Sequence, residues 1–259
     1  MVLYFSATNN SKFVAEYIAE KLNDNLVCMN DIIKNCNNFD FSSNTPFVVV
    51  APIYAWRVPR LVESLLENAK FNGSRDIYFV VTMGGMAGGY CKYLKKITKE
   101  KNLNYKGSAS VLMPDNYMVS FKMPSKSESI NTIKESLASI DKIVECIKGN
   151  IELDKEKDNL FGRFLSSFIN SCFYKFAIKP KKFTVSDKCI KCEQCIKNCP
   201  TNNISLINDK ISFEKNCMFC FGCIHKCPTH AIDYKGKGVK NGYYICPTIE
   251  EVYGEKGKQ

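Results

Sequence analysis

The 259-residue sequence has no run of eighteen apolar residues, so no segment is expected to span a membrane as a helix. It also lacks a basic leader, because its first five residues read directly as a buried strand. Together these two absences predict a cytoplasmic protein. Collagen-like repeats and low-complexity stretches are missing as well, and 45% apolar with 24% charged residues is a globular composition.

Acidic residues are the scarcer charge, since 36 Lys and Arg face 26 Asp and Glu and give a net charge of +10. The excess is spread along the chain, at +4 over residues 1–150 and +6 over residues 151–259. A nucleic-acid-binding arm would concentrate the charge, so nucleic acid is not expected as a partner. A diffuse positive field suits an acidic partner protein or anionic cofactors.

Histidine and tryptophan are rare, with two copies and one, whereas cysteine is abundant with fourteen. Eight cysteines form two runs of identical spacing, residues 189–200 and 217–228. In each run the cysteines are separated by two, two and three residues, and a proline follows the fourth. The six others share no metal-ligand spacing and read as packing residues of a reducing compartment: Cys28, Cys36, Cys91, Cys146, Cys172 and Cys246.

Three cysteines spaced by two residues can wrap one iron-sulfur cubane, but the fourth cysteine then points toward a different cluster. This crossed arrangement is the pattern of bacterial two-cluster ferredoxins. One predicted [4Fe-4S] cluster is held by Cys189, Cys192, Cys195 and Cys227. The other is held by Cys217, Cys220, Cys223 and Cys199. Paired zinc sites and a disulfide framework are weaker interpretations, because zinc does not need the third cysteine and disulfides suit secreted chains.

Residues 184–234 therefore resemble a bacterial 2[4Fe-4S] ferredoxin, which implies a small α+β domain. Its first strand is expected at residues 183–186 and a hairpin at residues 204–213. His225 and His230 lie within the second cysteine run and read as incidental, although His225 could tune a cluster through hydrogen bonding.

Apolar stretches alternate with helical periodicity in the first half of the chain. The predicted strands are residues 2–5, 26–29, 46–54, 77–83 and 108–113. The predicted helices are residues 13–22, 59–69, 90 to about 101, and 127–148. This alternation predicts an α/β fold with a doubly wound, five-stranded parallel sheet.

Ligands of such a sheet bind beyond the carboxyl ends of its strands. Three loops are expected at that edge: residues 6–11, 52–59 and 82–90. The first loop places hydroxyl and N–H groups at the start of a helix, where the helix dipole favours a phosphate. An ordinary Ser/Asn-rich helix cap has the same composition, so this loop alone does not decide between the two.

Residues 1–150 resemble flavodoxin, which implies FMN as a cofactor. For the FMN phosphate the resemblance implies Ser6, Thr8, Asn10 and Ser11, with Asn9 standing where the family has glycine. Asparagine tolerates the left-handed backbone that such a position requires. For the flavin ring it implies Pro52, Tyr54, Trp56 and Tyr90, and close backbone approach at Gly84, Gly85, Gly88 and Gly89. Trp56 reads equally well as a packing residue.

Four segments are expected: a flavodoxin-like domain at 1–150, a junction at 151–183, a ferredoxin domain at 184–245 and a Gly- and Lys-rich tail at 246–259. Within the junction, residues 151–158 read as solvated linker, and residues 160–176 carry an aromatic helical stripe. That helix is expected to pack between the two domains. A membrane-surface or partner-docking helix is the alternative, because five cations lie nearby: Arg163, Lys175, Lys179, Lys181 and Lys182.

Nearly the whole chain resembles the bacterial ferredoxins that carry an N-terminal flavodoxin-like domain. The resemblance implies electron transfer between redox partner proteins through two [4Fe-4S] clusters and FMN. The expected loops contain no Ser-His-Asp, paired-carboxylate or Cys-His constellation, which favours an electron carrier over a substrate-specific enzyme. They also lack the Gly-x-Gly-x-x-Gly fingerprint of a nicotinamide site. Two alternatives stay open: an iron-sulfur flavoenzyme that reduces a small substrate at the flavin, and a redox sensor with an empty flavodoxin-like domain.

Overall fold

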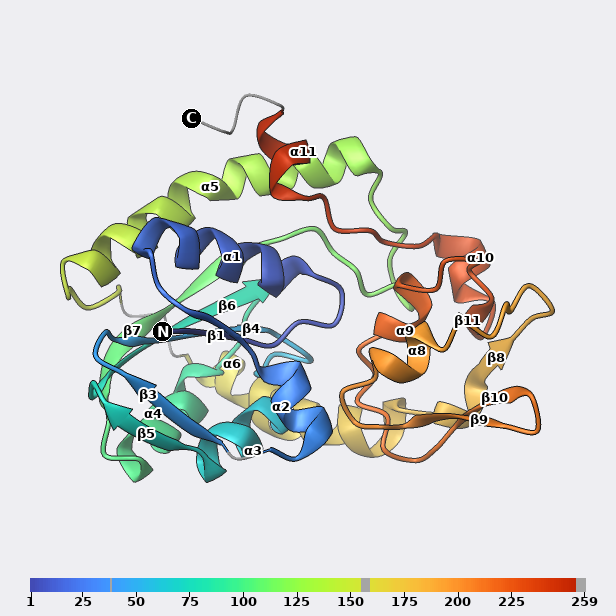
Figure 1. Ribbon diagram of the computed structural model, residues 1–259, viewed down its shortest axis with the longest axis horizontal. Helices are drawn as coiled ribbons and strands as arrows, with labels where there is room; N and C mark the ends of the chain where they lie inside the picture. Colours follow the sequence, from blue (N-terminus) through green and yellow to red (C-terminus); the bar gives the residue numbers. More distant parts are fainter. Residues whose placement is uncertain (38, 155–158, 255–259) are drawn as a thin grey trace.

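The computed structural model describes residues 1–37, 39–154 and 159–254. Its largest element is a five-stranded sheet in the order β2-β1-β4-β6-β7, in which all neighbouring strands are parallel (Figure 1). The strands are β1 (Val2–Tyr4), β2 (Leu26–Cys28), β4 (Phe47–Pro52), β6 (Asp76–Met83) and β7 (Asn104–Leu112). This is the doubly wound order of flavodoxin-like sheets, so the predicted fold class is confirmed.

Helices cover both faces of this sheet because its strands are apolar on both sides. One face carries α1 (Asn10–Leu22) and α5 (Lys126–Lys148), and the other carries α2 (Met29–Asn35), α3 (Arg60–Asn68) and α4 (Cys91–Glu100). Successive residues of β4 alternate between the two cores, since Val48 and Val50 pack with α1 and α5 whereas Val49 and Ala51 pack with α3 and α4.

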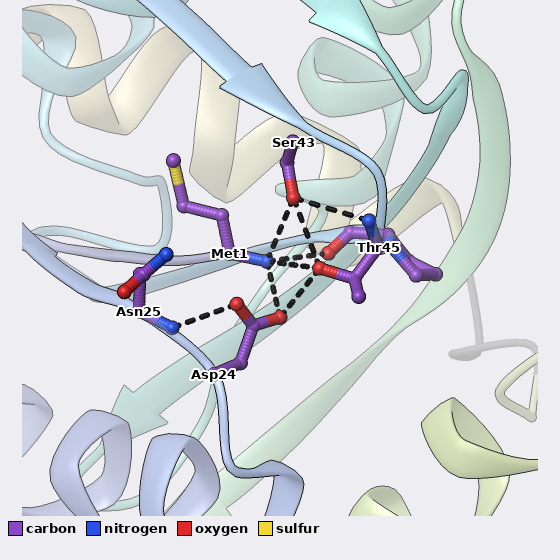
Figure 2. A network of polar contacts seen from close by, with 6 residues as sticks. Met1, Asp24, Asn25, Ser43 and Thr45 are labelled. Carbon is purple, nitrogen blue, oxygen red and sulfur yellow. Dashed lines mark hydrogen bonds and ion pairs between the residues drawn. The ribbon is translucent and has the colours of Figure 1, made fainter.

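A second, two-stranded parallel sheet that the sequence did not predict is formed by β3 (Asp40–Ser43) and β5 (Lys70–Gly73). A polar network ties the chain after β3 to the start of the main sheet (Figure 2). Its Met1 ammonium donates to Asp24 over 2.5 Å and to Thr45 over 2.9 Å. Burial raises the pKa of Asp24, but the hydrogen bonds it accepts outweigh burial and hold the pKa below its usual value.

Residues 160–177 form a continuous helix, named here the aromatic helix. It consists of α6 (Leu160–Phe164), the π-helical turn η1 (Leu165–Ile169), α7 (Asn170–Cys172) and a second π-helical turn, η2 (Phe173–Ala177). The Gly89 N–H donates to the Gly162 carbonyl over 3.0 Å, and the rings of Phe173 and Phe219 lie 6.0 Å apart. The helix therefore lies against both the sheet domain and the cysteine-rich region.

The chain just before this helix is packed, whereas the sequence predicts solvated linker at 151–158. The Leu153 N–H donates to the Lys106 carbonyl over 2.8 Å, and Leu153 is buried. Gly107 makes this contact possible, because it has a φ of 111° and a Cβ there would lie 2.8 Å from that of Leu153. Residues 155–158 lie outside the described part of the chain.

The cysteine-rich region is built from short paired elements. After η3 (Pro180–Lys182), β8 (Phe183–Val185) pairs antiparallel with β11 (Ile232–Tyr234), and β9 (Ile204–Ile207) pairs with β10 (Lys210–Phe213). Each cysteine run contains one helical turn, α8 (Gln194–Lys197) or α9 (Gly222–His225), and α10 (Lys237–Asn241) follows β11. Phe183, Phe221 and Tyr234 belong to the core that also contains α1 and α5, so one core spans both regions.

Two further contacts join the regions at the periphery. The Lys34 ammonium, on α2, donates to the carbonyls of Ile196 at 2.6 Å and Lys197 at 2.8 Å, where α8 ends. The chain after residue 245, which the sequence predicts as a tail, returns to the sheet domain instead: Cys246 is buried, and α11 (Ile249–Tyr253) packs beside α5 (Figure 1). Residues 255–259 lie outside the described part. Among the described helices, none combines the length and apolarity that crossing a membrane requires.

Candidate functional site

A cavity of about 580 Å³ lies at the carboxyl edge of the main sheet, against the cysteine-rich region. Residues of all three predicted loops line it, together with a fourth loop at residues 114–121 that follows β7. Its far wall is formed by Phe173 of the aromatic helix and by Phe219, Cys220 and Phe221 of the second cysteine run. The volume is that of a typical cofactor site, and the walls come from both halves of the chain.

The first loop, residues 6–11, is held rigidly by side-chain hydrogen bonds. Asn9 has a φ of 75°, the left-handed conformation that the sequence anticipates at this position. The Ser11 and Thr82 hydroxyls lie 2.7 Å apart, and the Asn116 amide donates to the Thr8 hydroxyl over 2.6 Å. Ser6, Thr8, Asn10 and Ser11 all line the cavity at the N-terminus of α1, where backbone N–H groups favour an anion.

Asn10 joins three segments at this loop. Its amide nitrogen donates to the Pro114 carbonyl over 2.9 Å, and its Oδ1 atom accepts from the Tyr244 hydroxyl over 2.6 Å. Tyr244 lies on the returning chain beyond α10, 234 residues later in the sequence. One of the residues that shape the first loop therefore comes from the opposite end of the chain.

Asn9 lines a different, smaller cavity of about 320 Å³. This cavity also contains Thr8, and on its other side Lys226 and His230 of the second cysteine run. The two regions touch here, because a Cβ on Gly222 would come within 3.1 Å of the Ala7 carbonyl oxygen. The prediction that Asn9 lies with the rest of the first loop at one site is therefore corrected.

The second loop contains a tight turn with an unusual backbone. Tyr54 and Arg57 form a bridge, and the two residues between them, Ala55 and Trp56, have φ values of 47° and 64°. A two-residue turn of this kind normally uses Asn or Gly, so each of these residues costs about 1 kcal/mol. Asn170 of the aromatic helix is fully buried and donates to the carbonyls of Tyr54 and Ala55 at 3.2 and 3.0 Å.

The strained turn brings its side chains to the cavity. Pro52, Tyr54 and Trp56 line the wall, as the sequence predicts. Burial raises the pKa of the Tyr54 hydroxyl, and the nearby Cys220 thiol adds to the rise. Tyr54 thus lies close to a predicted cluster ligand.

The glycine-rich third loop divides into two parts. Gly84 and Gly85 line the cavity, and a Cβ on Gly85 would meet no atom within 4 Å. Gly88 and Gly89 do not line it, because they serve protein packing instead. A Cβ on Gly88 would lie 2.5 Å from that of Trp56, and one on Gly89 would lie 2.7 Å from the Gly162 carbonyl.

Tyr90 also lies away from the cavity. Its side chain is fully buried in the core beneath α3 and α4, directly before the first residue of α4. The predicted flavin contacts at Tyr90, Gly88 and Gly89 are therefore corrected, because the third loop turns into the core after its first glycines.

The fourth loop supplies cavity residues that the sequence analysis missed. Asp115, Asn116, Tyr117 and Phe121 all line the wall. The rule that pointed to the other loops would have found this one, since it follows the fifth strand at the same edge. Asn170, Tyr244 and Phe219 had no such local signal, because their positions depend on how the two regions pack.

The cavity suits FMN in its chemical pattern. One end has hydroxyls and the N-terminus of α1 for a phosphate, and the other has aromatic side chains for a planar ring. At the rim, Met86 and Phe121 are 54% and 53% exposed although both are large and apolar. A flat ring seated between them would cover this apolar surface.

The motif cysteines that influence one another follow the two predicted groups. Burial raises the pKa of Cys223 well above its usual value and that of Cys220 to about 12, and the thiols of Cys199 and Cys217 add to both rises. Burial likewise raises the pKa of Cys195 to about 11, with added contributions from Cys227 and Cys189. Cys199 thus lies near Cys220 and Cys223, and Cys227 lies near Cys195.

Backbone N–H groups point at the two exchanged sulfurs in the same way. Asn203 donates to the Cys199 Sγ atom and Ala231 to the Cys227 Sγ atom, both over 3.3 Å. Burial raises the pKa of Cys227, but this bond and those from Thr229 and Ile232 outweigh it and lower the pKa below its usual value. Such N–H groups stabilise a thiolate, which is the form that binds iron.

All eight candidate ligands of the two cysteine runs are thiols. A cubane holds its four thiolates at separate irons, whereas zinc draws its ligands around one centre. The donor set is all sulfur, as [4Fe-4S] clusters require.

His225 is a structural link between the regions, whereas the sequence reads it as incidental. Its Nδ1 atom accepts the Tyr244 N–H over 3.0 Å, so its Nε2–H donates to the Asn116 carbonyl, also over 3.0 Å. Burial lowers the pKa of His225 to about 4, which keeps the ring neutral. The imidazole thereby connects α9, the fourth loop and the returning chain.

Comparison with known families agrees with this division of the chain. Residues 1–165 match the family described as Flavodoxin domain, and residues 181–228 match the family described as 4Fe-4S dicluster domain. The chain belongs to the flavodoxin-domain family. Its flavodoxin match reaches into the aromatic helix, and a 4Fe-4S dicluster domain is fused behind it. No curated protein matches the chain.

Several solved structures are similar to the flavodoxin domain at low identity. A flavoprotein in complex with FMN from Lactobacillus acidophilus is 17% identical over 42% of this chain and 90% of its own, with a TM-score of 0.31. General stress protein 14 in complex with FMN from Treponema denticola is 13% identical over 56% and 98%, with a TM-score of 0.34. The Trp repressor binding protein of Bacillus subtilis is 11% identical over 60% and 99%, with a TM-score of 0.30.

Proposed function

We propose that this protein transfers electrons between FMN, bound in the cavity of the flavodoxin domain, and two [4Fe-4S] clusters bound by the eight motif cysteines. Flavin exchanges one or two electrons and a cubane exchanges one, so the pair can connect two-electron and one-electron partners. The proposal places the chain among bacterial ferredoxins with an N-terminal flavodoxin-like domain.

The observation that carries the proposal is the position of Cys220. This cysteine lines the cavity together with its neighbours Phe219 and Phe221, and it adds to the rise that burial causes in the pKa of Tyr54, another residue of the cavity wall. A cluster ligand that shares a wall with the flavin site needs no further group between the two cofactors. The set of Cys217, Cys220, Cys223 and Cys199 is therefore the inner set, next to the flavin.

The outer set of Cys189, Cys192, Cys195 and Cys227 faces the surface. Cys192 is exposed, and so are Lys188 and Lys197, whereas Lys191 is paired with Asp209 over 2.9 Å. This arrangement supports an acidic redox partner that docks over the outer set, since charge complementarity steers such encounters.

The residues of the cavity have distinct roles in this proposal. Ser6, Thr8, Asn10 and Ser11 bind the phosphate with the N–H groups of α1, while Tyr54 and Trp56 contact the ring from one side. Phe173, Phe219 and Phe221 exclude water from the wall shared with the inner set. No nucleophile or paired carboxylate is assigned a catalytic role.

Anaerobic reconstitution followed by assays of iron, sulfide and flavin tests the proposal. We expect about eight irons and one FMN per chain, as two cubanes require. Four irons or fewer in a fully reconstituted sample would contradict the two-cluster assignment. Iron without flavin would instead favour a sensor with an empty flavodoxin domain.

Paired variants test which set is inner. Both Cys220→Ser and Cys192→Ser are expected to perturb one cluster each. Only Cys220→Ser should raise the fluorescence of bound FMN, because a neighbouring cluster quenches it. Equal fluorescence in the two variants would contradict the assignment of the inner set.

A further inference from the structure

The outward face of the aromatic helix is an apolar stripe. Its members are between 49% and 83% exposed: Leu160, Phe161, Phe164, Phe168 and Phe176. The phenylalanines recur at helical spacing, and the rings of Phe164 and Phe168 stack 5.5 Å apart. Five large apolar residues in one row are more than the scattered exposure that a monomer surface normally shows.

The opposite face of the helix fixes this orientation. Gly162, Leu165, Ser166 and Asn170 are buried against the flavodoxin domain. The Tyr93 hydroxyl donates to the Ser166 carbonyl over 3.1 Å, and Asn170 bonds the second loop. Rotating the helix to bury its apolar stripe would break these hydrogen bonds and place phenylalanine rings, which cannot form them, against the same polar groups.

The charge along this segment has one sign. Residues 159–186 contain no Asp or Glu. The lysines among their five cations are all exposed and lie toward the C-terminal end of the aromatic helix and just beyond it: Lys175, Lys179, Lys181 and Lys182. The Lys175 ammonium lies 5.3 Å from the ring of Phe176, so cation and apolar stripe are adjacent.

We propose that the aromatic helix binds the surface of a bilayer rich in anionic lipid. The exposed phenylalanines can insert shallowly below the lipid headgroups. The flanking cations can then bind the phosphate groups of those headgroups. A second copy of this chain fits less well, because it would oppose two segments that each carry five positive charges and no negative ones. This inference is independent of the proposed electron transfer.

Flotation of the full-length, reconstituted protein with lipid vesicles tests the proposal. Vesicles of phosphatidylglycerol and phosphatidylcholine are expected to bind the protein, and pure phosphatidylcholine vesicles to bind it at least tenfold less. The affinity for the anionic vesicles should fall with rising salt, because the attraction is screened.

Two variants separate the apolar and the charged contributions. Phe164→Ser/Phe168→Ser should weaken vesicle binding roughly tenfold or more, since two rings that would insert into the bilayer are lost. Lys181→Gln/Lys182→Gln should weaken it about fivefold per lysine. The control is Val239→Ser, which removes a more exposed apolar side chain on α10, 83% exposed against 49% for Phe164 and 59% for Phe168, and should leave binding unchanged. Unchanged visible absorption and circular dichroism would establish that each variant is folded.

Three results would overturn the proposal. The first is equal binding of the wild-type protein to both kinds of vesicle, and the second is full binding by the double phenylalanine variant. The third is no vesicle binding at all. In that last case, sedimentation velocity showing a dimer that the phenylalanine variant abolishes would assign the stripe to a second copy, and a monomer would leave an acidic protein as its occupant.

Discussion

The Tyr244 hydroxyl donates a hydrogen bond of 2.6 Å to the Oδ1 atom of Asn10, across 234 residues of sequence. Asn10 in turn donates to the Pro114 carbonyl, so one side chain spans the first loop, the fourth loop and the returning chain. The cavity wall at the N-terminus of α1 is therefore shaped in part by Tyr244, a residue outside the flavodoxin match.

Tyr244→Phe is expected to weaken FMN binding without unfolding the chain. The substitution leaves the buried Asn10 Oδ1 atom without its donor, at a cost of about 1–3 kcal/mol. A fluorescence titration with FMN should show the dissociation constant rising by roughly tenfold. Tyr243→Phe is the control, because its hydroxyl makes only a 3.4 Å bond at the surface. Equal affinities for the two variants would show that Asn10 does not depend on Tyr244.

Gly88→Ala should destabilise the flavodoxin domain more than Gly236→Ala. Both glycines have positive φ values, of 78° and 70°, so both variants incur about 1 kcal/mol of backbone strain. Only at Gly88 would the new Cβ collide with Trp56, at 2.5 Å, whereas nothing lies within 4 Å of the position at Gly236. Denaturant unfolding should place the two variants about 1–3 kcal/mol apart. Similar unfolding midpoints for the two variants would mean that the second loop, which contains Trp56, moves aside to accept the new methyl group.

Asn170→Ala should lower both stability and flavin affinity. The fully buried amide satisfies the carbonyls of Tyr54 and Ala55, so its loss costs about 2–4 kcal/mol and releases the strained turn. Thermal unfolding and an FMN titration measure the two effects. Asn68→Ala removes an exposed amide that donates to the Ser64 carbonyl at the end of α3, and it should change neither quantity appreciably. A loss of stability alone would separate Asn170 from the shape of the cavity.

Lys34→Met should loosen the contact between α2 and the first cysteine run. The substitution removes the ammonium that donates to the carbonyls of Ile196 and Lys197, which lowers the free energy of unfolding by about 1–3 kcal/mol. Hydrogen exchange at α8 should quicken, with Lys70→Met, an exposed lysine on β5, as the control. Unchanged exchange at α8 would show that the shared core alone holds the regions together.

Four serine variants test the crossed ligation through spectroscopy. Cys227→Ser should reproduce the electron paramagnetic resonance changes of Cys192→Ser, and Cys199→Ser those of Cys220→Ser. The expectation follows from the neighbours of the two exchanged thiols. Were Cys227→Ser to resemble Cys220→Ser, each run would ligate its own cluster.

The parallel sheet and the position of the dicluster domain could be predicted because their signals are local. Apolar strands such as 46–54 and the fixed cysteine spacing need no knowledge of distant residues. The glycines show where this reasoning fails. A sequence cannot reveal whether a missing side chain leaves room for a ligand, as at Gly85, or for protein, as at Gly89 against Gly162.

Three functional residues were not predicted because their roles also depend on distant contacts. Asn170, His225 and Tyr244 act through contacts between regions, and each is an ordinary residue of its own segment. The expected linker at 151–158 was misjudged because Leu153 packs on a strand that ends 41 residues earlier, where Gly107 makes room. The many charged residues of 151–158 predicted exposure, although one side chain among them, Leu153, is buried.

The bond between Asn10 and Tyr244 has a consequence for biosynthesis. The sheet domain can fold while translation continues, but the Asn10 Oδ1 atom lacks its donor until Tyr244 has left the ribosome. The loop before α1 therefore acquires its last hydrogen bond only after the cysteine-rich region has been synthesised.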